Sequence, residues 1–369
     1  MIEPSFEKTT LAWSLPWDAD WVTAVTFMGS SRRLAAGNNL GEILVWDVPE
    51  NTGDPAPAPC RRLDGHTNAI TRLRATPDGR WLISASYDHT IRFWDLEAEA
   101  KNSTEVVLNA RARAEAASRT GTKVPPPVTV KVDTQPAQRA LEVHKEWILG
   151  LAMSGDGNLL VSGDDAGDIV VWDRPGGKES RRWRINGWTY TLALAPDAEQ
   201  LLISERIPFS YAQAHPKRYC GLNLWSPATG EMQRDIGGLF PSQHMVAAAF
   251  SPEGNVLALA QGGEFEASNA KVTLVDPATG KKLRELTPGH HNGATDVAFH
   301  PGGKFLASTG RDTVIRIWNV ADGKLVKELG KPRGGQFKDW FHALAFSADG
   351  RWLAAADMAG LVHLWSIAG

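Results

Sequence analysis

Residues 81–95 read WLISASYDHTIRFWD: two short apolar runs joined by a polar turn, with the second run ending in Trp94-Asp95. This ending, or a close variant of it, occurs six more times, at Trp46-Asp47, Trp172-Asp173, Trp225-Ser226, Val275-Asp276, Trp318-Asn319 and Trp365-Ser366. Successive anchors lie 43 to 53 residues apart, except for one gap of 78 residues. A period in the forties with this ending is the signature of the blades of a β-propeller.

The residues before each anchor follow a common pattern. Pairs of apolar residues two positions apart share one face of a strand, and they occur at Val25/Phe27, Leu73/Ala75, Leu151/Met153, Leu192/Leu194, Ala248/Phe250, Val297/Phe299 and Leu344/Phe346. A turn with glycine follows, as at Pro77-Asp78-Gly79, because a tight hairpin needs a positive φ. A second strand, the third strand with its Trp, and an outer fourth strand complete the repeat. The sequence therefore predicts an all-β fold, a seven-bladed β-propeller of four-stranded antiparallel blades.

These residues resemble the WD-repeat (WD40) family over nearly the whole chain. The resemblance is most specific in the second and sixth repeats, where the family's buried hydrogen-bonded tetrad is matched by His66, Ser84, Asp88 and Trp94 and by His290, Ser308, Asp312 and Trp318. In the third repeat His144, Ser162 and Trp172 match, but Ala166 stands at the position of the aspartate. The resemblance implies that these histidines are satisfied structural groups rather than metal ligands or general bases.

The last repeat lacks a fourth strand of its own, because only residues 366–369 follow Trp365. An unpaired strand edge there would invite aggregation. We expect the N-terminal residues 1–15 to supply the outer strand of the seventh blade and so to close the ring, as is common in the family. The whole chain, residues 1–369, is then a single WD40 propeller domain.

The gap of 78 residues contains an insertion at residues 97–137, between the third and fourth strands of the second repeat. Its first half, Asn102 to Ser118, predicts a helix with Asn102 as N-cap and Glu105 three residues later. Because the insertion follows a third strand, we expect it on the bottom face, opposite the loops that lead into the first strands. It is either a solvated excursion or a docking segment for an acidic partner through its basic residues Arg111, Arg113, Arg119 and Lys123.

Charge and cysteine content narrow the class of protein. The net charge is −3 with 22% charged residues, so no overall field favours nucleic acid or an anionic membrane. For Cys60 and Cys220 we expect two buried thiols in a reducing compartment rather than a disulfide. The N-terminus has no leader pattern, and no run approaches the roughly 18 apolar residues of a membrane-spanning helix. We expect a cytoplasmic protein without a cofactor, a monomer within a larger assembly.

Three long loops are predicted on the top face, where the loops into the first strands and those joining second to third strands emerge. They lie at residues 207–219, 262–266 and 331–337. Loops on a rigid scaffold are where binding residues usually lie. Their aromatic and basic side chains are candidate partner-binding residues: Phe209, Tyr211, Lys217, Arg218, Tyr219, Phe265 and Phe337.

Four tryptophans share one register, at the start of the innermost strand of their repeats: Trp21, Trp147, Trp188 and Trp340. All but Trp188 follow an acidic residue. Aromatic faces beside carboxylates attract lysine, arginine or methylated ammonium groups, and tryptophan is enriched among interface hot spots. The pattern predicts a protein or peptide partner with cationic character. The alternative is that the rings only pack beneath the loops, filling space where the family's histidine is missing.

Sequence motifs of known chemistry are absent. There is no Gly-x-Ser-x-Gly elbow, P-loop or His-Glu-x-x-His motif. His290-His291 lacks a third ligand at metal spacing, and the acids at 164, 165 and 168 indicate a polar turn rather than a calcium loop. The inner strands offer mainly apolar and small residues.

The leading hypothesis is therefore a non-catalytic interaction scaffold that binds a protein or peptide on the top face around the channel mouth. A variant of it places the partner at the 97–137 insertion. The alternative is a propeller enzyme or small-molecule sensor with a ligand in the channel mouth. Two carboxylates, or a histidine and a carboxylate, that converge in the pore would favour that alternative.

Overall fold

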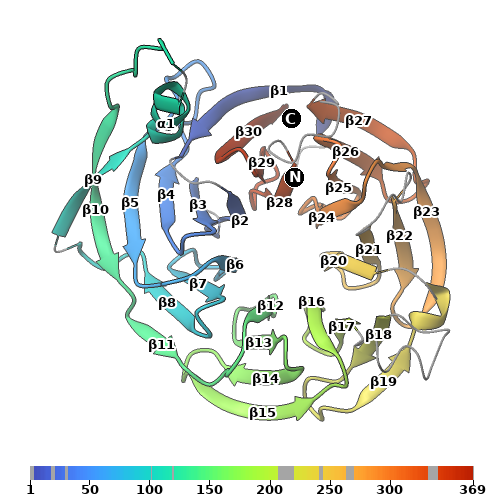
Figure 1. Ribbon diagram of the computed structural model, residues 1–369. Coiled ribbons are helices and arrows are strands. Elements are labelled where there is room, and N and C mark those ends of the chain that lie inside the picture. Colours follow the sequence, from blue (N-terminus) through green and yellow to red (C-terminus); the bar gives the residue numbers. More distant parts are fainter. Residues whose placement is uncertain are drawn as a thin grey trace.

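The computed structural model describes residues 4–17, 21–29, 32–100, 102–118, 120–206, 220–240, 244–262, 270–330 and 340–368. Within these residues seven sheets stand around a central channel, so the fold is the predicted seven-bladed β-propeller (Figure 1). In each blade the first strand lines the channel and the fourth strand lies at the rim.

The strands of the first four blades follow one another outward from the channel. Blade one contains β2 (Val22–Phe27), β3 (Arg33–Asn38), β4 (Ile43–Asp47) and β5 (Pro59–Asp64). Blade two contains β6 (Ile70–Ala75), β7 (Trp81–Ser86), β8 (Ile91–Asp95) and β11 (Arg139–Leu141). Blade three contains β12 (Ile148–Met153), β13 (Leu159–Asp164), β14 (Asp168–Asp173) and β15 (Lys178–Arg184). Blade four contains β16 (Trp188–Leu194), β17 (Leu201–Arg206), β18 (Cys220–Trp225) and β19 (Met232–Asp235), followed by a short 3-10 helix, η1 (Gly237–Leu239).

The remaining three blades repeat this order. Blade five contains β20 (His244–Phe250), β21 (Leu257–Gly262), β22 (Ala270–Asp276) and β23 (Lys281–His290). Blade six contains β24 (Ala294–Phe299), β25 (Phe305–Gly310), β26 (Val314–Asn319) and β27 (Leu325–Gly330). Blade seven contains β28 (Phe341–Phe346), β29 (Trp352–Asp357), β30 (Leu361–Ala368) and, as its outer strand, β1 (Ser5–Pro16).

The insertion in blade two folds back onto blade one. It forms β9 (Asn102–Val107), helix α1 (Ala110–Ser118) and β10 (Thr129–Pro136). Strand β10 runs parallel to β5 and antiparallel to β9, so the sheet of blade one grows to six strands. The predicted helix from Asn102 is therefore wrong up to residue 109, since Asn102–Val107 form β9 and the helix begins only at Ala110. Val106 and Val132 are buried in the core cluster of Trp46, and this tertiary packing outweighs the local capping signal.

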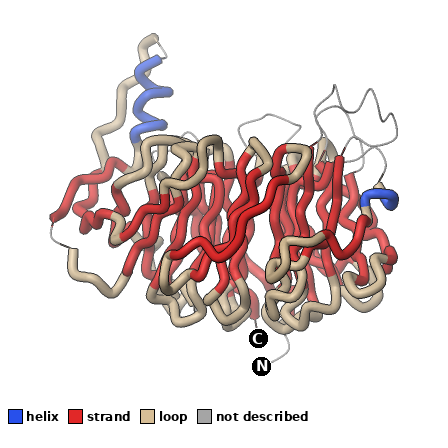
Figure 2. Tube along the Cα trace, turned by 90° about the horizontal axis from the view of Figure 1, so that it is seen from below, coloured by secondary structure: helices blue, strands red, loops and turns tan. Residues whose placement is uncertain are grey.

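The position of α1 also differs from the expectation of a bottom-face excursion. Third strands end on the bottom face, and β30 is the third strand of blade seven. Figure 2 shows α1 standing out at the edge of the ring, on the side opposite the C-terminal end of β30. The helix therefore projects on the top side. The insertion leaves blade two at the bottom, but β9 and β10 run along the rim and carry the chain across.

Strand β1 closes the ring as predicted. It pairs antiparallel with β30, from Ser5 opposite Ala368 to Pro16 opposite Leu361. The Trp13 ring stacks on Trp352 of blade seven with centroids 5.4 Å apart, and its Nε1–H donates to the carbonyl of Asp54 in blade one at 3.0 Å. A single strand thus contributes to the packing of two neighbouring blades.

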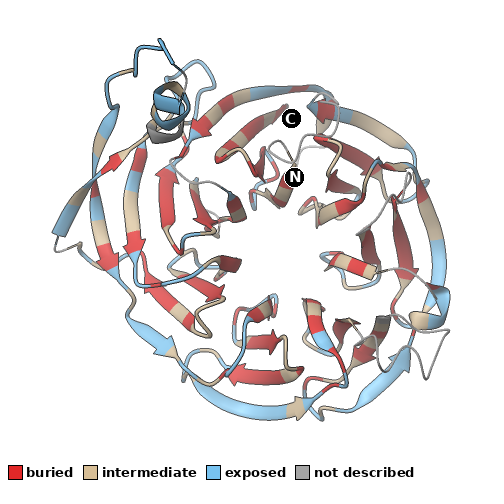
Figure 3. Ribbon diagram, viewed as in Figure 1, coloured by how far each residue is buried: buried red, intermediate tan, exposed pale blue. Residues whose placement is uncertain are grey.

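Neighbouring blades are joined by apolar clusters and by hydroxyl hydrogen bonds. Figure 3 shows buried residues concentrated in the middle strands of the blades and exposed residues on outer strands such as β15 and β19. Thr23 Oγ1 on β2 donates to the carbonyl of Ile70 on β6, at 2.5 Å. Thr71 Oγ1 on β6 repeats the bond to Ile148 on β12, at 2.7 Å. These bonds fix the spacing of the first strands around the channel.

The expectation of two buried thiols is wrong for Cys60. It is a free cysteine near the start of β5 and is exposed, one residue before the pairing of β5 with β10 begins at Arg61. Its Sγ lies 3.3 Å from the carbonyl of Val45. Partial desolvation and the nearby Asp47 carboxylate raise the pKa of the Cys60 thiol to about 11, so it is a weak nucleophile at neutral pH. The side chain of Cys220 lies outside the described residues.

The closing strand provides a test of this architecture. Trp13→Ala should lower the free energy of unfolding by about 3–5 kcal/mol, because it removes a buried aromatic ring together with its bond to blade one. Leu11→Ala is the matched control, since Leu11 lies on the same strand but is 52% exposed. Urea unfolding followed by tryptophan fluorescence measures both variants. Equal midpoints for the two would contradict the assigned role of β1.

Candidate functional site at the channel mouth

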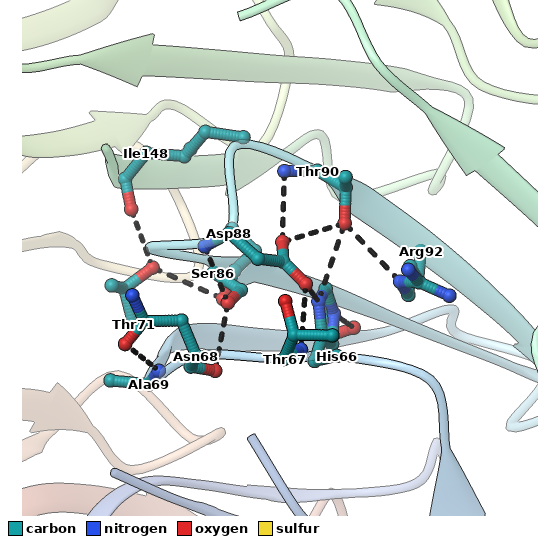
Figure 4. A network of polar contacts seen from close by, with 12 residues as sticks. His66, Thr67, Asn68, Ala69, Thr71, Ser86, Asp88, Thr90, Arg92 and Ile148 are labelled. Atoms are coloured by element: carbon teal, nitrogen blue, oxygen red, sulfur yellow. Dashed lines mark hydrogen bonds and ion pairs between the residues drawn. The ribbon is translucent and has the colours of Figure 1, made fainter. Parts of the chain in front are cut away.

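The predicted tetrads of blades two and six come together at the turns between second and third strands. In blade two, His66 Nδ1 lies 2.7 Å from Asp88 Oδ2 and Nε2 lies 2.7 Å from Ser84 Oγ, while Trp94 Nε1–H donates to the same hydroxyl at 2.9 Å. Figure 4 shows Asp88 between His66 and Thr90. Blade six repeats this arrangement with His290, Asp312, Ser308 and Trp318, at 2.8–2.9 Å.

Blade three has a complete tetrad, so the expectation that Ala166 leaves it incomplete is wrong. His144 Nδ1 lies 2.8 Å from Asp164 Oδ2, and Nε2 lies 2.7 Å from Ser162 Oγ. Trp172 Nε1–H donates to that hydroxyl at 2.9 Å. The carboxylate comes from the last residue of β13, two positions earlier in the chain than in blades two and six.

The same early position is used in blades one and seven. Asp164 Oδ1 accepts the N–H groups two and four residues later, at 3.1 and 2.9 Å. Asn38 does the same at 2.9 and 2.8 Å, and Asp357 does so at 2.9 and 2.8 Å. In blade seven, Asp357 Oδ2 also binds His363 Nε2 at 2.9 Å, and the other ring nitrogen of His363 meets Ser14 on β1 at 2.8 Å.

A short sequence signal marks these turns and could have been found. The turns at 38–41, 164–167 and 357–360 read NNLG, DDAG and DMAG, with the fourth residue a glycine at φ of 83° to 88°. In blades two and six the turns read SYDH and GRDT, where the aspartate is third and the fourth residue is His89 or Thr313 at positive φ. A fixed spacing from Ser to Asp finds only the second form.

The tetrads are held in one protonation state. Burial lowers the pKa of His66 and His290 below the ordinary 6.5, so both imidazoles are neutral at pH 7. Burial alone would raise the pKa of Asp312, but the hydrogen bond from His290 and the Arg316 charge outweigh it and hold that pKa at about 2. Every polar atom of the tetrads has a partner, which suits a structural network and leaves no free base.

These turns support the start of each first strand, where the tryptophans lie. The backbone N–H of the second turn residue donates to the carbonyl of the register residue: Asn39 to Trp21, Asp165 to Trp147 and Met358 to Trp340, at 2.9–3.0 Å. The same bond joins Tyr87 to Ala69 and Arg311 to Gly293, at 3.0 Å. The polar turns therefore set the height and direction of the tryptophan register.

The tryptophans differ in their surroundings. Trp21, Trp147 and Trp188 are 47%, 48% and 43% exposed, which is unusual for such large apolar side chains. Trp147 stacks on Tyr87 with centroids 4.9 Å apart. The guanidinium of Arg206 lies 5.5 Å from the Trp188 ring, and that of Arg311 lies 4.7 Å from the Trp340 ring. The chain's own cations thus already contact two of the four rings.

The candidate residues of the three long loops lie outside the described residues. These are Phe209, Tyr211, Lys217, Arg218, Tyr219, Phe265 and Phe337. Their role in partner binding stays a prediction.

Beneath the tryptophan register lies a hollow of about 340 Å³. It is lined by residues of all seven blades, including Trp21, Tyr87, Tyr190, Arg311 and His342. A smaller cavity of about 70 Å³ continues inward and is lined in part by Arg72, Arg74, Asp296 and His342. The expectation of mainly apolar and small inner strands thus missed these residues, because only the assembled ring brings single polar positions from different blades together.

Two further observations limit the chemistry of the described residues. Within the described ranges, no three His, Cys, Asp or Glu side chains are grouped closely enough to hold a metal ion. The same ranges contain no helix that is long and apolar enough to cross a membrane.

Comparison with known proteins identifies the repeats. The family "WD domain, G-beta repeat" matches residues 57–95, 136–173, 280–319 and 327–366. Each match runs from the outer strand of one blade to the third strand of the next, and the four end in blades two, three, six and seven. Within the part of the chain that the structure describes, these are the blades in which a turn aspartate is paired with a histidine, buried in blades two, three and six and partly exposed in blade seven.

Three relatives that align with most of this chain are distant from it in sequence. A guanine nucleotide-binding protein subunit beta of Oryza sativa subsp. indica is 22% identical over 83% of this chain and 70% of its own length. The nuclear distribution protein PAC1 of Arthroderma otae is 25% identical over 84% of this chain and 61% of its own length. The small ribosomal subunit protein RACK1y of Oryza sativa subsp. japonica is 26% identical over 83% of this chain and 80% of its own length.

The carboxylate of blade three can be tested directly. Asp164→Ala should lower the free energy of unfolding by about 2 kcal/mol or more, because His144 and two backbone N–H groups lose their acceptor. Asp168→Ala is the control, since Asp168 follows the same turn as the first residue of β14 and lies outside the tetrad. Thermal melts compare the two. A smaller loss in Asp164→Ala than in Asp168→Ala would contradict the assignment.

The tetrads also predict an acid-labile ring. Because the pKa values of His66 and His290 are lowered in the folded state, the unfolded chain binds more protons than the folded chain below pH 6.5. The free energy of unfolding therefore decreases as the pH falls below that value. The lowered pKa values of Asp164 and Asp312 add a second loss of stability below about pH 4. The melting temperature should therefore fall as the pH is lowered from 7 to 3. A melting temperature that is constant or rises over this range would refute the assigned protonation states.

Proposed function

Because the chain is a WD-repeat β-propeller, we propose that it is a non-catalytic interaction scaffold whose top face binds an extended segment of a protein partner at the channel mouth. The observation that carries this proposal is the set Trp21, Trp147 and Trp188, three large rings that remain nearly half exposed at one register of their blades, with Trp21 lining the hollow of about 340 Å³. Exposed apolar groups of this size mark interaction sites, and tryptophan is enriched among interface hot spots.

The alternative that the rings only fill space beneath the loops fits them less well. A ring that serves packing would be mostly buried, as Trp46, Trp94, Trp172 and Trp318 are. Two of the distant relatives also bear on the proposal, since they are named as members of assemblies, a guanine nucleotide-binding protein and the small ribosomal subunit.

The charge around the mouth supports a partner with a cationic group on the side of blade three. Trp147 follows Glu146 in the sequence, and its backbone carbonyl accepts a hydrogen bond from the backbone N–H of Asp165. Burial and the neighbouring carboxylates of Glu146 and Asp164 raise the pKa of Asp165, so this corner of the mouth has excess negative charge. A lysine or arginine of the partner would relieve the repulsion and could lie over the Trp147 ring. At Trp188 and Trp340 the chain's own arginines already take that role.

A small-molecule ligand in the mouth is the second candidate, since about 340 Å³ is within the range of ligand pockets. Catalysis by the histidine and carboxylate of the channel has less support. Both oxygens of Asp296 accept backbone N–H groups, from Val297 at 2.9 Å and from Leu344 at 2.7 Å. The proposal further includes a cytoplasmic monomer within a larger assembly that contacts neither nucleic acid nor membrane.

A capture experiment tests the binding surface. Wild type should retain a protein partner from lysate that Trp21→Ala/Trp147→Ala loses by at least tenfold, since two hot-spot rings are removed. Met232→Ala/Leu283→Ala is the matched control, because those side chains are 53% and 48% exposed on outer strands. The melting temperature of each variant establishes that it is folded. Equal capture by the Trp21→Ala/Trp147→Ala variant and the control would contradict the proposal and favour binding at the 97–137 insertion.

A further inference from the structure

The inner strand of blade two places two arginines inside the channel. Arg72 and Arg74 lie two residues apart on β6 and therefore project to the same side of the strand. Both line the inner cavity of about 70 Å³, together with Asp296 on β24 and His342 on β28. Arg72 and His342 also line the hollow of about 340 Å³ above it, so the two spaces form one passage from the mouth inward.

The two guanidinium groups use few of their donors. Arg72 Nη1 donates to the carbonyl of Thr71 at 2.8 Å, and Arg74 Nη1 donates to that of Leu73 at 2.8 Å. A guanidinium has five N–H donors. Among the residues that the structure describes, the salt bridges include no carboxylate within 4.0 Å of either group. Several strong donors are therefore left toward the channel.

The carboxylate of Asp296, which also lines the inner cavity, already accepts hydrogen bonds from the backbone. Asp296 gives each of its oxygens to a backbone N–H, one on its own strand and one on β28. Burial raises the pKa of Asp296 above its ordinary value, although the backbone N–H groups and the charges of Arg72 and Arg74 act in the opposite direction. Burial and the charge of Arg72 lower the pKa of Arg74 to about 10, so Arg74 still carries its proton at pH 7.

The passage is positive within a chain of negative net charge. Its described lining contains Arg72, Arg74 and Arg311 against the single carboxylate of Asp296. The whole chain carries −3. A cleft lined by one sign of charge concentrates ions of the other sign, and like charges enclosed by protein are costly unless a counter-charge accompanies them.

We propose that the channel binds a small oxyanion, a carboxylate or phosphate group, between Arg72, Arg74 and His342. Guanidinium groups match the paired oxygens of such groups with two parallel hydrogen bonds. His342 makes no hydrogen bond among the described residues, and burial with the charges of Arg311 and Arg72 lowers its pKa to about 4, so its neutral ring can donate one N–H. A cavity of about 70 Å³ suits a single charged group, far below the size of pockets for whole organic ligands.

The experiment uses the full chain, with sodium phosphate and sodium malonate as probes. At equal ionic strength each probe should raise the melting temperature of the wild type more than sodium chloride does. In calorimetry, Arg72→Gln and Arg74→Gln should each weaken phosphate binding roughly tenfold to hundredfold, the loss expected for charge-assisted hydrogen bonds. Arg351→Gln is the control, since that arginine pairs with Asp349 on the surface. Without added oxyanion, Arg74→Gln should melt no lower than wild type, because it removes a repulsion.

The proposal is overturned if both probes act like sodium chloride, or if they act equally on wild type and on the folded glutamine variants. The probes are measured without a partner, so this test stands apart from the proposed function. The source of the group is distinguished by adding excess phosphate to a captured partner. Release would identify an acidic side chain of the partner as the occupant, and retention would identify a free ion; both agree with an oxyanion site.

Discussion

Closure of the ring by the N-terminal strand is the constraint on which the rest of the structure depends. Strand β1 is distant in sequence from its partner β30. It nevertheless serves as the fourth strand of blade seven, in which β30 is the third strand. Its residues contact blade six through Phe6, blade seven through Trp13 and blade one through the carbonyl of Asp54. An open ring would have no channel, and the residues of blades two, six and seven would no longer share a cavity.

Within the closed ring, the polar turns between second and third strands link stability to the binding surface. An aspartate or asparagine in each of five turns satisfies backbone N–H groups, and in four of these turns it also holds a histidine, which is buried in blades two, three and six and partly exposed in blade seven. The same turns also support the first strand of their blade, because the backbone carbonyl of its register residue accepts a hydrogen bond from a turn N–H. Trp21, Trp147 and Trp340 are thus positioned by the turns of their own blades.

The fold could be predicted from the sequence because each blade repeats local signals, namely paired apolar residues, a glycine turn and the Trp anchor. Two parts of the fold could not. The residues from Asn102 onward carry a helix cap, but Val106 on β9 and Val132 on β10 are buried in the core cluster of Trp46, and that core is distant from both in the sequence. Asp164 was missed because the turn places its carboxylate where blades two and six use a residue two positions later. The candidate site was predictable only as a register of tryptophans. Arg72, Arg74, Asp296 and His342 each stand in a strand that is otherwise ordinary, and only the closed ring brings them together.

Hydrogen–deuterium exchange of the chain with and without its captured partner tests the central claim most directly. The account predicts that protection on binding is concentrated at the starts of β2, β12 and β16, around Trp21, Trp147 and Trp188, and at the turns behind them. Protection confined to β9, α1 and β10, with the mouth unchanged, would contradict it and place the interaction on the inserted segment.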